Sequence, residues 1–336
     1  MGKIRGRQSY FLDVVSEEVG CSCGVLLSDA NISRIADRYQ IDGLQDLGRV
    51  EEETIFRPEE LESAILDLRV AIGNLPDSKM GQFILMDACR AISEAGGDPI
   101  KINEAYHKVA ESGKYKSLTA DAIEEIAQAS GQRERHVLQF ARAWDDMRRR
   151  QVSFYYQRVR QKPWDGAVQL DRLFEGEHIP NDPGVYLDQR YIDYLAKNGE
   201  DLVKMHWRNF ERLTSEFFQR QGYEVDLGPG TKDGGVDVRV WTDKEGKAGP
   251  PLLLVQCKRT KDVVGVETVK AFWTDVAFEK AEQGLIATTA AVSGGGKKIC
   301  EVRQWPMNFA EGEQVKAWAR SMWRVWPRGR LNKNTR

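Results

Sequence analysis

The chain has 336 residues, of which 41% are hydrophobic and 30% charged, with a formal net charge of −2 at pH 7. This length suits two domains, and the sequence holds no apolar run of the roughly 20 residues that a membrane-spanning helix needs. No apolar stretch follows the basic start at Met1–Arg7 and the five cysteines lack zinc-type spacing, so we expect a soluble cytoplasmic protein with reduced thiols and no signal peptide.

The first half of the chain reads as a series of amphipathic helices. Apolar side chains recur at helical spacing, and Ser28 or Asp29 and Thr119 are candidate caps. The helices that we expect are Tyr10–Val19, Asn31–Tyr39, one that opens at Pro58, Lys79–Ala95, Pro99–Ser112 and Thr119–Ala129. We therefore predict a mostly α-helical N-terminal domain over residues 1–162, with a possible role in DNA or partner recognition.

Residues 118–147 suggest two helices joined by a short turn at Ser130-Gly131. This pattern fits a helix-turn-helix DNA reader, and it fits equally a helical hairpin that only packs. The region from Gln132 to Pro163 has nine basic residues against three acidic ones, so one side of the molecule can be positive although the chain is near neutral.

The basic region supplies the first candidate DNA contacts. They are Arg148, Arg149, Arg150, Arg158 and Arg160. In the run Phe154–Arg160 the aromatic rings either stack on unpaired bases or form the core side of a connecting helix. Residues 163–199 are rich in proline and glycine, and we expect a linker that contains a short helix over Tyr186–Lys197.

A further amphipathic helix is expected over His206–Gln221. Its apolar stripe includes Trp207 and Phe210. Glu211 follows that stripe directly and is expected at the edge of the buried face, whereas Glu216 is expected to be solvated.

Three strands are expected next. Tyr223–Leu227 and Val236–Val240 alternate with period two, and a Gly/Pro-containing hairpin leads to the apolar run Leu252–Val255. If the last two strands pair, Asp237, Gln256 and Lys258 gather on one face at the strand ends. Carboxylate and amide oxygens suit Mg²⁺ or Mn²⁺, and a lysine beside such an ion can orient a water. The alternative is a surface ion pair of Asp237 and Lys258.

The remainder of the chain completes an α/β pattern. We expect a helix over Val266–Ala281, a buried strand over Gly284–Thr288 and a closing helix over Ala310–Trp323. Between them, Gly294–Lys298 is expected to be a flexible loop in which Lys297 and Lys298 contact the DNA backbone. The loop lacks the spacing of a nucleotide-hydrolysing phosphate loop.

The motifs of the second half, taken together, resemble the Mrr-type nuclease domain of the PD-(D/E)xK superfamily. The motifs are Trp207-x-x-Phe210-Glu211, Gly222-Tyr223-x-Val225, Asp233-Gly-Gly-Val-Asp237, Gln256-Cys-Lys258, Val264–Glu267 and Gly284–Thr289. The resemblance covers residues 200–320 and implies a restriction-endonuclease-like domain over 200–325, a central mixed sheet flanked by helices, followed by a basic tail at 326–336. After Thr289 the Gly-rich, basic segment departs from the family pattern.

The resemblance also implies roles for individual residues. Asp237, Gln256 and the backbone carbonyl of Cys257 would bind Mg²⁺ or Mn²⁺, Glu211 would hold a second metal or a metal-bound water, and Lys258 would position the attacking water. The implied function is a Mg²⁺-dependent DNA endonuclease with 5′-phosphate products, acting in restriction or anti-phage defence.

Several alternatives stay open at this point. One is a recombination or repair nuclease that acts on branched or single-stranded DNA, and another is a nuclease-fold protein that only binds DNA. Cutting both strands with one site per chain implies a homodimer or higher oligomer, and a defence-system partner protein is possible.

Overall fold

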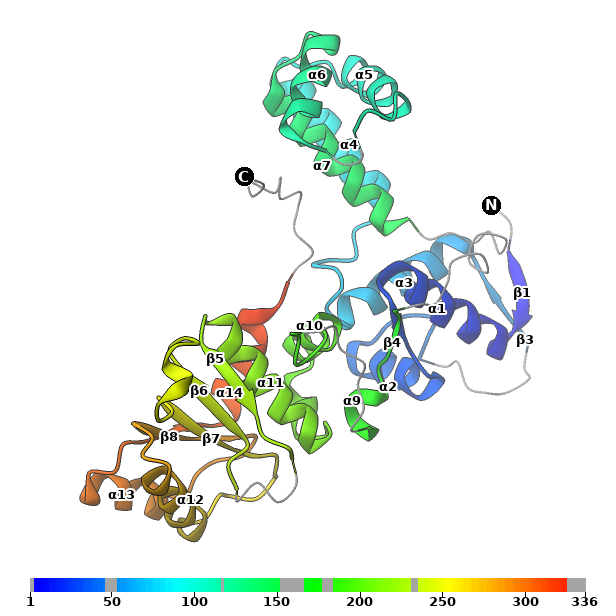
Figure 1. Ribbon diagram of the computed structural model, residues 1–336. Coiled ribbons are helices and arrows are strands. Elements are labelled where there is room, and N and C mark those ends of the chain that lie inside the picture. Colours follow the sequence, from blue (N-terminus) through cyan, green and yellow to red (C-terminus); the bar gives the residue numbers. More distant parts are fainter. Residues whose placement is uncertain are drawn as a thin grey trace.

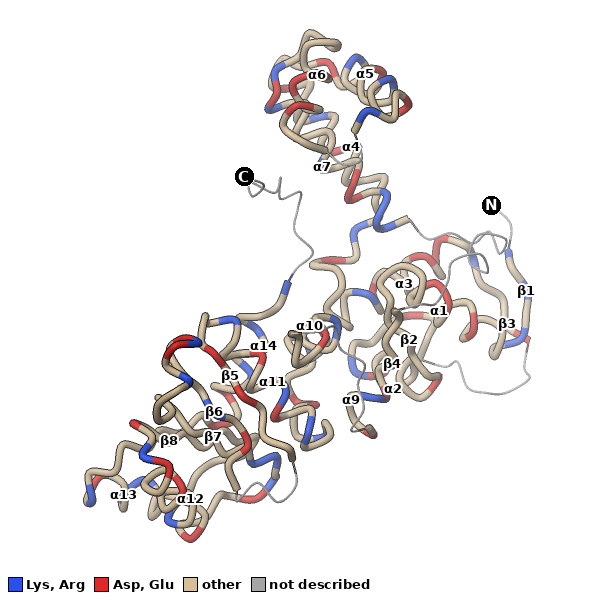
Figure 2. Tube along the Cα trace, viewed as in Figure 1, with Lys and Arg blue, Asp and Glu red and all other residues tan. Residues whose placement is uncertain are grey.

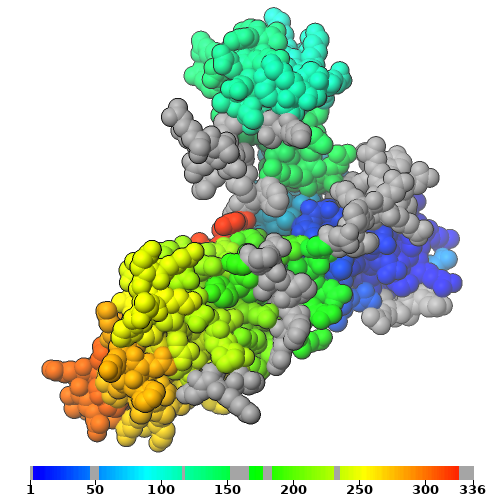
Figure 3. Space-filling view, in the orientation of Figure 1, coloured from blue at the N-terminus to red at the C-terminus, as the bar shows by residue number. Residues whose placement is uncertain are grey.

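The computed structural model describes residues 3–45, 53–115, 118–151, 166–176, 184–230 and 235–324. Helices α4–α7 form a lobe that projects from the remainder of the chain, and the C-terminal third folds around a five-stranded sheet (Figures 1 and 3). Among the described residues, none of the helices combines the length and the apolar composition that spanning a membrane would require.

The N-terminal part contains three helices and short strands. Its elements are β1 (Ile4–Arg7), α1 (Gln8–Cys23), β2 (Val25–Leu26), α2 (Asp29–Tyr39), β3 (Glu53–Phe56) and α3 (Pro58–Ala71). Strand β1 pairs antiparallel with β3, and β2 pairs parallel with β4 (Val168–Gln169). The helices were predicted, and Ser28 caps α2. The strands were not predicted, because two to four residues are too few to show an alternating pattern.

Four helices form the projecting lobe around a hydrophobic core of their own. They are α4 (Gly81–Glu94), α5 (Pro99–Glu111), α6 (Ala120–Ser130) and α7 (Glu134–Arg150). Ile102, Ile126 and Phe140 are central to that core. Thr119 caps α6 as predicted, and Gly131 ends the helix with a positive φ of 64° that favours glycine. The predicted pair of helices with a short turn is thus present.

The packing divides the chain differently from the expected break at residue 162. Apolar side chains of α1–α3 share one core cluster with residues of the C-terminal sheet, whereas α4–α7 form a separate cluster. The shared cluster also includes α9 (Arg172–Glu175), α10 (Gln189–Lys197) and the short helix η1 (Gly199–Val203), through Leu173, Tyr191 and Leu202 among others. This stretch, which we expected to be a linker with a short helix, carries large apolar side chains that pack into the core.

The C-terminal part is a five-stranded mixed sheet covered by helices. Its elements are α11 (Trp207–Arg220), β5 (Glu224–Leu227), β6 (Val238–Trp241), η2 (Gly246–Ala248), β7 (Leu253–Lys258), α12 (Val266–Phe278), β8 (Gln283–Thr288), α13 (Gly294–Arg303), β9 (Met307–Ala310) and α14 (Gly312–Met322). The strand order is β5-β6-β7-β8-β9. The first two pairings are antiparallel and the last two are parallel. The predicted mixed sheet, behind a mostly helical N-terminal half, is confirmed.

Alternate residues of the central strands face different helical layers. Val255 and Leu285 pack into the cluster that contains α11 and α14, whereas Leu254 and Ile286 pack against α12 and α13. Figure 1 shows these two helical layers on opposite faces of the sheet. Because side chains alternate along a strand, Gln256 and Lys258 share the face of Leu254, as predicted.

Two sequence-based expectations about this part are wrong. Gly294–Lys298 is the first turn of α13 and not a loop, because Ser293 accepts a hydrogen bond from the Gly296 amide and caps the helix. Glu216 is buried and not solvated. Its carboxylate accepts hydrogen bonds from the Tyr186 amide at 2.8 Å and from Arg220 Nε at 2.8 Å, so it ties α11 to the segment before α10.

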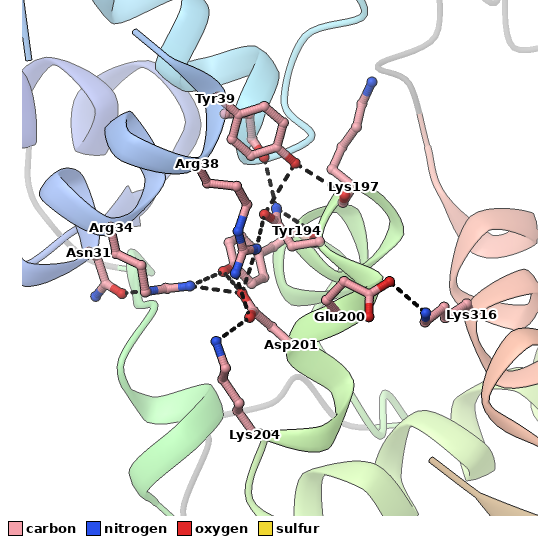
Figure 4. A network of polar contacts seen from close by, with 12 residues as sticks. Asn31, Arg34, Arg38, Tyr39, Tyr194, Lys197, Glu200, Asp201, Lys204 and Lys316 are labelled. Carbon is pink, nitrogen blue, oxygen red and sulfur yellow. Dashed lines mark hydrogen bonds and ion pairs between the residues drawn. The ribbon is translucent and has the colours of Figure 1, made fainter. Parts of the chain in front are cut away.

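A buried polar network joins the N-terminal helices to the C-terminal part. The Asp201 carboxylate is inaccessible to solvent and binds Arg34 and Arg38 of α2, each at 2.8 Å. Tyr194 and Lys204 contact the same carboxylate (Figure 4). Burial alone would raise the pKa of Asp201, but these partners hold it well below its usual range. The carboxylate is therefore a charged anchor between α2 and the segment that leads into α11.

Candidate active site

Asp237 stands directly before β6, where the chain enters the sheet. Its amide donates to the Val255 carbonyl at 3.0 Å, and its carbonyl accepts from the Gly228 amide at 2.8 Å. Its side-chain Oδ2 accepts a hydrogen bond from the Cys257 amide at 2.6 Å. Neighbouring strands thus hold the half-buried carboxylate through their backbone, next to the end of β7.

Gln256 lies on β7 with its side chain in a buried position. Only 6% of the residue is exposed, and Nε2 donates to the Gly235 carbonyl at 2.9 Å. Gly235 has a positive φ of 91°, and a Cβ there would stand 3.1 Å from Nε2, so glycine permits this close approach. Within the described part of the chain, the other amide atom, Oε1, is buried and has no hydrogen-bond partner. A buried, unpaired acceptor of this kind is rare and calls for a ligand or water.

Cys257 turns to the opposite face and packs against α11. Its Sγ lies 3.5 Å from Thr214 Oγ1. Burial raises the pKa of the Cys257 thiol well above its usual value, and the negative charges of Asp237 and Glu211 add to that effect. The thiol is therefore a neutral core group, as predicted, while its backbone amide serves Asp237.

Glu211 is buried and paired with a neighbouring arginine. Arg208 Nη1 lies 2.6 Å from Glu211 Oε2, and Arg208 Nη2 donates to the Gly228 carbonyl at 2.7 Å. The Gly228 amide in turn bonds to the Asp237 carbonyl, so the contacts run from Glu211 through Arg208 to Asp237. The sequence analysis missed Arg208, although its spacing of three residues from Glu211 is that of a helical ion pair.

Lys258 ends β7, one residue beyond Cys257. Its backbone carbonyl accepts a hydrogen bond from Thr288 Oγ1 at 2.9 Å, which fixes the strand end against β8. The side chain is half-buried, and its positive charge reaches Cys257. Within the described part of the chain, Lys258 Nζ forms neither an ion pair nor a hydrogen bond with another side chain, so the ammonium group is available to a ligand.

The donor atoms around Asp237 suit a hard divalent cation. They are a carboxylate, the unpaired Gln256 Oε1 and backbone carbonyls, all of them oxygen. Across the described ranges, His, Cys, Asp and Glu side chains form no group of three or more that could hold a metal. Glu211 already pairs with Arg208. The arrangement is therefore better suited to a metal ion held by a few protein oxygen atoms than to one held by a cluster of carboxylates.

The residues predicted to contact DNA differ in their burial and in their ion pairs. Arg150 is 1% exposed and pairs with Asp77 and Asp146, so it is a structural residue and the expected surface contact is wrong. Arg149 pairs with Asp145, whereas Arg148 is exposed. Arg158 and Arg160 lie outside the described residues.

The two candidate lysines sit on the first turn of α13. Lys297 pairs with Glu311 at 2.8 Å, and Lys298 is exposed. Of the described candidates, only Arg148 and Lys298 therefore have exposed side chains outside the ion pairs described here.

The C-terminal part matches the profile of a known protein family. Residues 202–319 match the family profile Mrr_cat, described as a restriction endonuclease. The type IV methyl-directed restriction enzyme EcoKMrr of Escherichia coli (strain K12) is 27% identical over 177 residues, which cover 49% of this chain and 57% of that protein. The uncharacterized protein y4cE of Sinorhizobium fredii (strain NBRC 101917 / NGR234) is 27% identical over 122 residues, 36% of this chain and 31% of that protein.

The chain thus spans about a third to somewhat over half of the length of these relatives. Among solved structures, the MspJI restriction endonuclease in complex with a 27-mer oligonucleotide matches with 21% identity and a TM-score of 0.28. That match covers 45% of this chain and 34% of the other.

Proposed function

Because residues 202–319 form an Mrr-type, restriction-endonuclease-like domain, we propose that the chain is a Mg²⁺-dependent DNA endonuclease that acts in restriction. The observation that carries this proposal is the buried Gln256 Oε1, unpaired among the described residues, on β7 one residue before Cys257, whose amide binds the Asp237 carboxylate. The sheet has no structural need for an unsatisfied acceptor there, whereas a hydrated divalent cation would use it.

Asp237, Gln256 Oε1 and the Cys257 carbonyl would hold the Mg²⁺, and Mn²⁺ has the same oxygen preference. The bound ion supplies Lewis-acid stabilisation of charge on the scissile phosphate. The Cys257 amide fixes the Asp237 carboxylate, so that the carboxylate does not have to reorganise when DNA arrives.

Lys258 has two roles in the proposed reaction. Its ammonium group would orient the attacking water by hydrogen bonding, and its charge would offset the negative charge that builds up on the pentacoordinate phosphorus. Glu211, which pairs with Arg208, would act as a positioning residue that helps to hold Gly228 against Asp237.

The biological role that we propose is based on the relatives of this chain. EcoKMrr is a methyl-directed restriction enzyme by name, and we propose the same kind of role here, cutting of foreign or modified DNA in defence. Cleavage of both strands would need two copies of this single site, so a homodimer or higher oligomer belongs to the proposal.

A cleavage assay on plasmid DNA tests the function. Plasmid from a methylating and from a non-methylating host is incubated with the wild-type chain in Mg²⁺ or in EDTA. We expect nicked or linear product only with Mg²⁺, and more of it from one of the two plasmids. Asp237→Ala should abolish cleavage but leave DNA binding measurable, because the phosphate contacts lie elsewhere. Binding without cleavage by the wild type, in Mg²⁺ and in Mn²⁺, would refute the proposal.

A further inference from the structure

A cavity of about 660 Å³ lies where helices α4 and α7 meet the end of α3. This volume is in the range of sites for small-molecule ligands. It is lined by six cationic and four acidic side chains, together with several apolar ones. Half of the cations already have carboxylate partners: Lys79 pairs with Asp87, Arg149 with Asp145 and Arg150 with Asp77. Within the described residues, the other three, Arg69, Arg135 and Arg142, have no such partner.

Arg69 is the most unusual of the three. It is 2% exposed, and its Nε donates to Asn74 Oδ1 at 2.9 Å, but its Nη1 is buried and finds no hydrogen-bond partner among the described residues. Burial lowers the pKa of Arg69, and the acids whose charge reaches it are Glu18 and Asp146. A buried guanidinium with an unused N–H group carries a desolvation cost that an anionic ligand would offset.

The opposite wall is a face of α7. Arg135, Gln139 and Arg142 stand four and three residues apart, so they share one side of the helix, and all three are exposed. Arg135 Nε donates to Nε2 of its neighbour His136, and within the described residues neither Arg135 nor Arg142 has an ion-pair partner. Figure 2 shows acidic and basic positions close together at the end of the α4–α7 lobe that lies nearest the remainder of the chain.

The cavity also offers apolar surface. Leu75 and Ala143 are buried in its wall, and Ile84 and Leu138 are half-buried there. Guanidinium groups of Arg bind phosphate with two parallel hydrogen bonds, and an adjacent apolar wall suits a flat ring. The guanidinium groups of Arg69 and Arg142 line the same cavity as this apolar surface. A nucleotide would satisfy that combination, whereas a bare carboxylate would use only part of it.

We propose that this cavity binds a phosphate-bearing small molecule of nucleotide size, with Arg69 and Arg142 as the phosphate ligands. The site lies outside the nuclease domain and does not depend on the nuclease activity proposed above. Its two walls belong to different hydrophobic cores, because Leu68, next to Arg69, packs with the α1–α3 core and Phe140 packs in the core of the α4–α7 lobe. A bound ligand would therefore bridge the lobe and the body.

Calorimetric titration of the full chain with ATP tests the proposal. We expect saturable binding with a Kd below about 1 mM, and a loss of about tenfold or more in Arg142→Gln. Arg142 is exposed, so this variant should fold; Arg69→Met should show the same loss, and its unfolding temperature reports whether it is intact. The control is Arg148→Gln, on the same helix but not on the cavity wall, which should bind ATP like the wild type.

Adenosine and short duplex DNA are the comparison probes. Adenosine should bind at least about tenfold more weakly than ATP, because it lacks the phosphates. The proposal is overturned if ATP does not bind saturably, if adenosine binds as well as ATP, or if Arg148→Gln weakens ATP binding as much as Arg142→Gln does. It is equally overturned if Arg142→Gln impairs binding of duplex DNA but leaves ATP binding unchanged, since the face of α7 would then be a DNA-reading surface.

Discussion

The amide of Cys257 donates a hydrogen bond to Oδ2 of Asp237 at a distance of 2.6 Å. This bond links the start of β6 to the end of β7. The bonded amide lies between Gln256 and Lys258, whose side chains face the opposite side of the sheet from the side chain of Cys257. A carboxylate held by the backbone of the neighbouring strand is fixed before any ligand binds, and such preorganisation is what a metal site or an electrostatic catalyst requires.

The first prediction concerns the amide of Gln256. Glutamine is needed here because Nε2 donates to the Gly235 carbonyl, and a carboxylate would put two acceptors together. We expect Gln256→Glu to lower the free energy of unfolding by about 1–3 kcal/mol without metal, and to regain stability when Mg²⁺ is added. Thermal unfolding with and without Mg²⁺ measures both effects.

Gln283→Glu is the matched control for that variant. Gln283 is exposed on β8 and uses its Oε1 to accept from Asn308, a bond that a carboxylate keeps. Its unfolding should not respond to Mg²⁺. Equal Mg²⁺ responses in the two variants would show that the ion does not bind at residue 256.

Arg208 supplies a second prediction. It pairs with the buried Glu211, so Arg208→Met should weaken the compensation of that charge and cost about 3–5 kcal/mol in the free energy of unfolding. The double variant with Glu211→Gln should recover part of that loss, because both charges of the pair are then removed. Chemical denaturation measures the two values; no recovery in the double variant would mean that the pair is not coupled.

From the burial of Asp193 we predict that the stability of the fold depends on pH. Burial raises the pKa of Asp193 to about 6, above the value of about 3.9 in an unfolded chain. Between those two values the folded chain binds more protons than the unfolded one, so this group's contribution to stability falls as the pH rises and is lost above about pH 6. Asn at this position can still accept from Gln189 and from the Arg324 amide.

Asp193→Asn should therefore gain stability relative to the wild type, by about 1–3 kcal/mol, between roughly pH 4.5 and 7. Denaturant unfolding of both proteins across this range gives the difference directly. A constant difference across the range would contradict the raised pKa.

The Asp201 network yields a prediction for the junction of α2 with the C-terminal part. Asp201→Asn removes the charge that Arg34 and Arg38 share, and we expect a loss of about 3–5 kcal/mol in the free energy of unfolding. Glu313→Gln, which weakens an exposed pair with Lys316, should cost less than about 1 kcal/mol. Similar losses in the two variants would contradict the anchoring role of Asp201.

The sheet and its order of motifs could be predicted from the sequence because the strands alternate clearly or run apolar. Val238, Leu254 and Ile286 show their burial in the pattern itself. The relation between the two halves could not be predicted. It depends on Asp201 meeting α2 more than 160 residues away in the sequence, and the pairing of distant charged residues leaves no trace in local spacing.

The strand pairing beneath the candidate site could be predicted from the sequence, but the contacts of its residues could not. Spacing indicates that the strands of Asp237 and Gln256 pair, and the expected gathering of Asp237, Gln256 and Lys258 rests on that pairing. The partner of Glu211, the burial of Glu216 and the burial of Arg150 depend on long-range packing of polar groups. The composition of Gly294–Lys298 is typical of a loop. In the structure these residues begin a helix that is capped by Ser293.

The account rests most directly on Lys258, whose ammonium group is proposed to act in the reaction and not in binding. Single-turnover cleavage and DNA affinity should be measured side by side for the wild type and Lys258→Ala in saturating Mg²⁺. We predict that the rate falls by about a hundredfold or more while the Kd for DNA changes less than about threefold. An unchanged cleavage rate, or a loss of rate explained entirely by weaker DNA binding, would contradict the proposed active site.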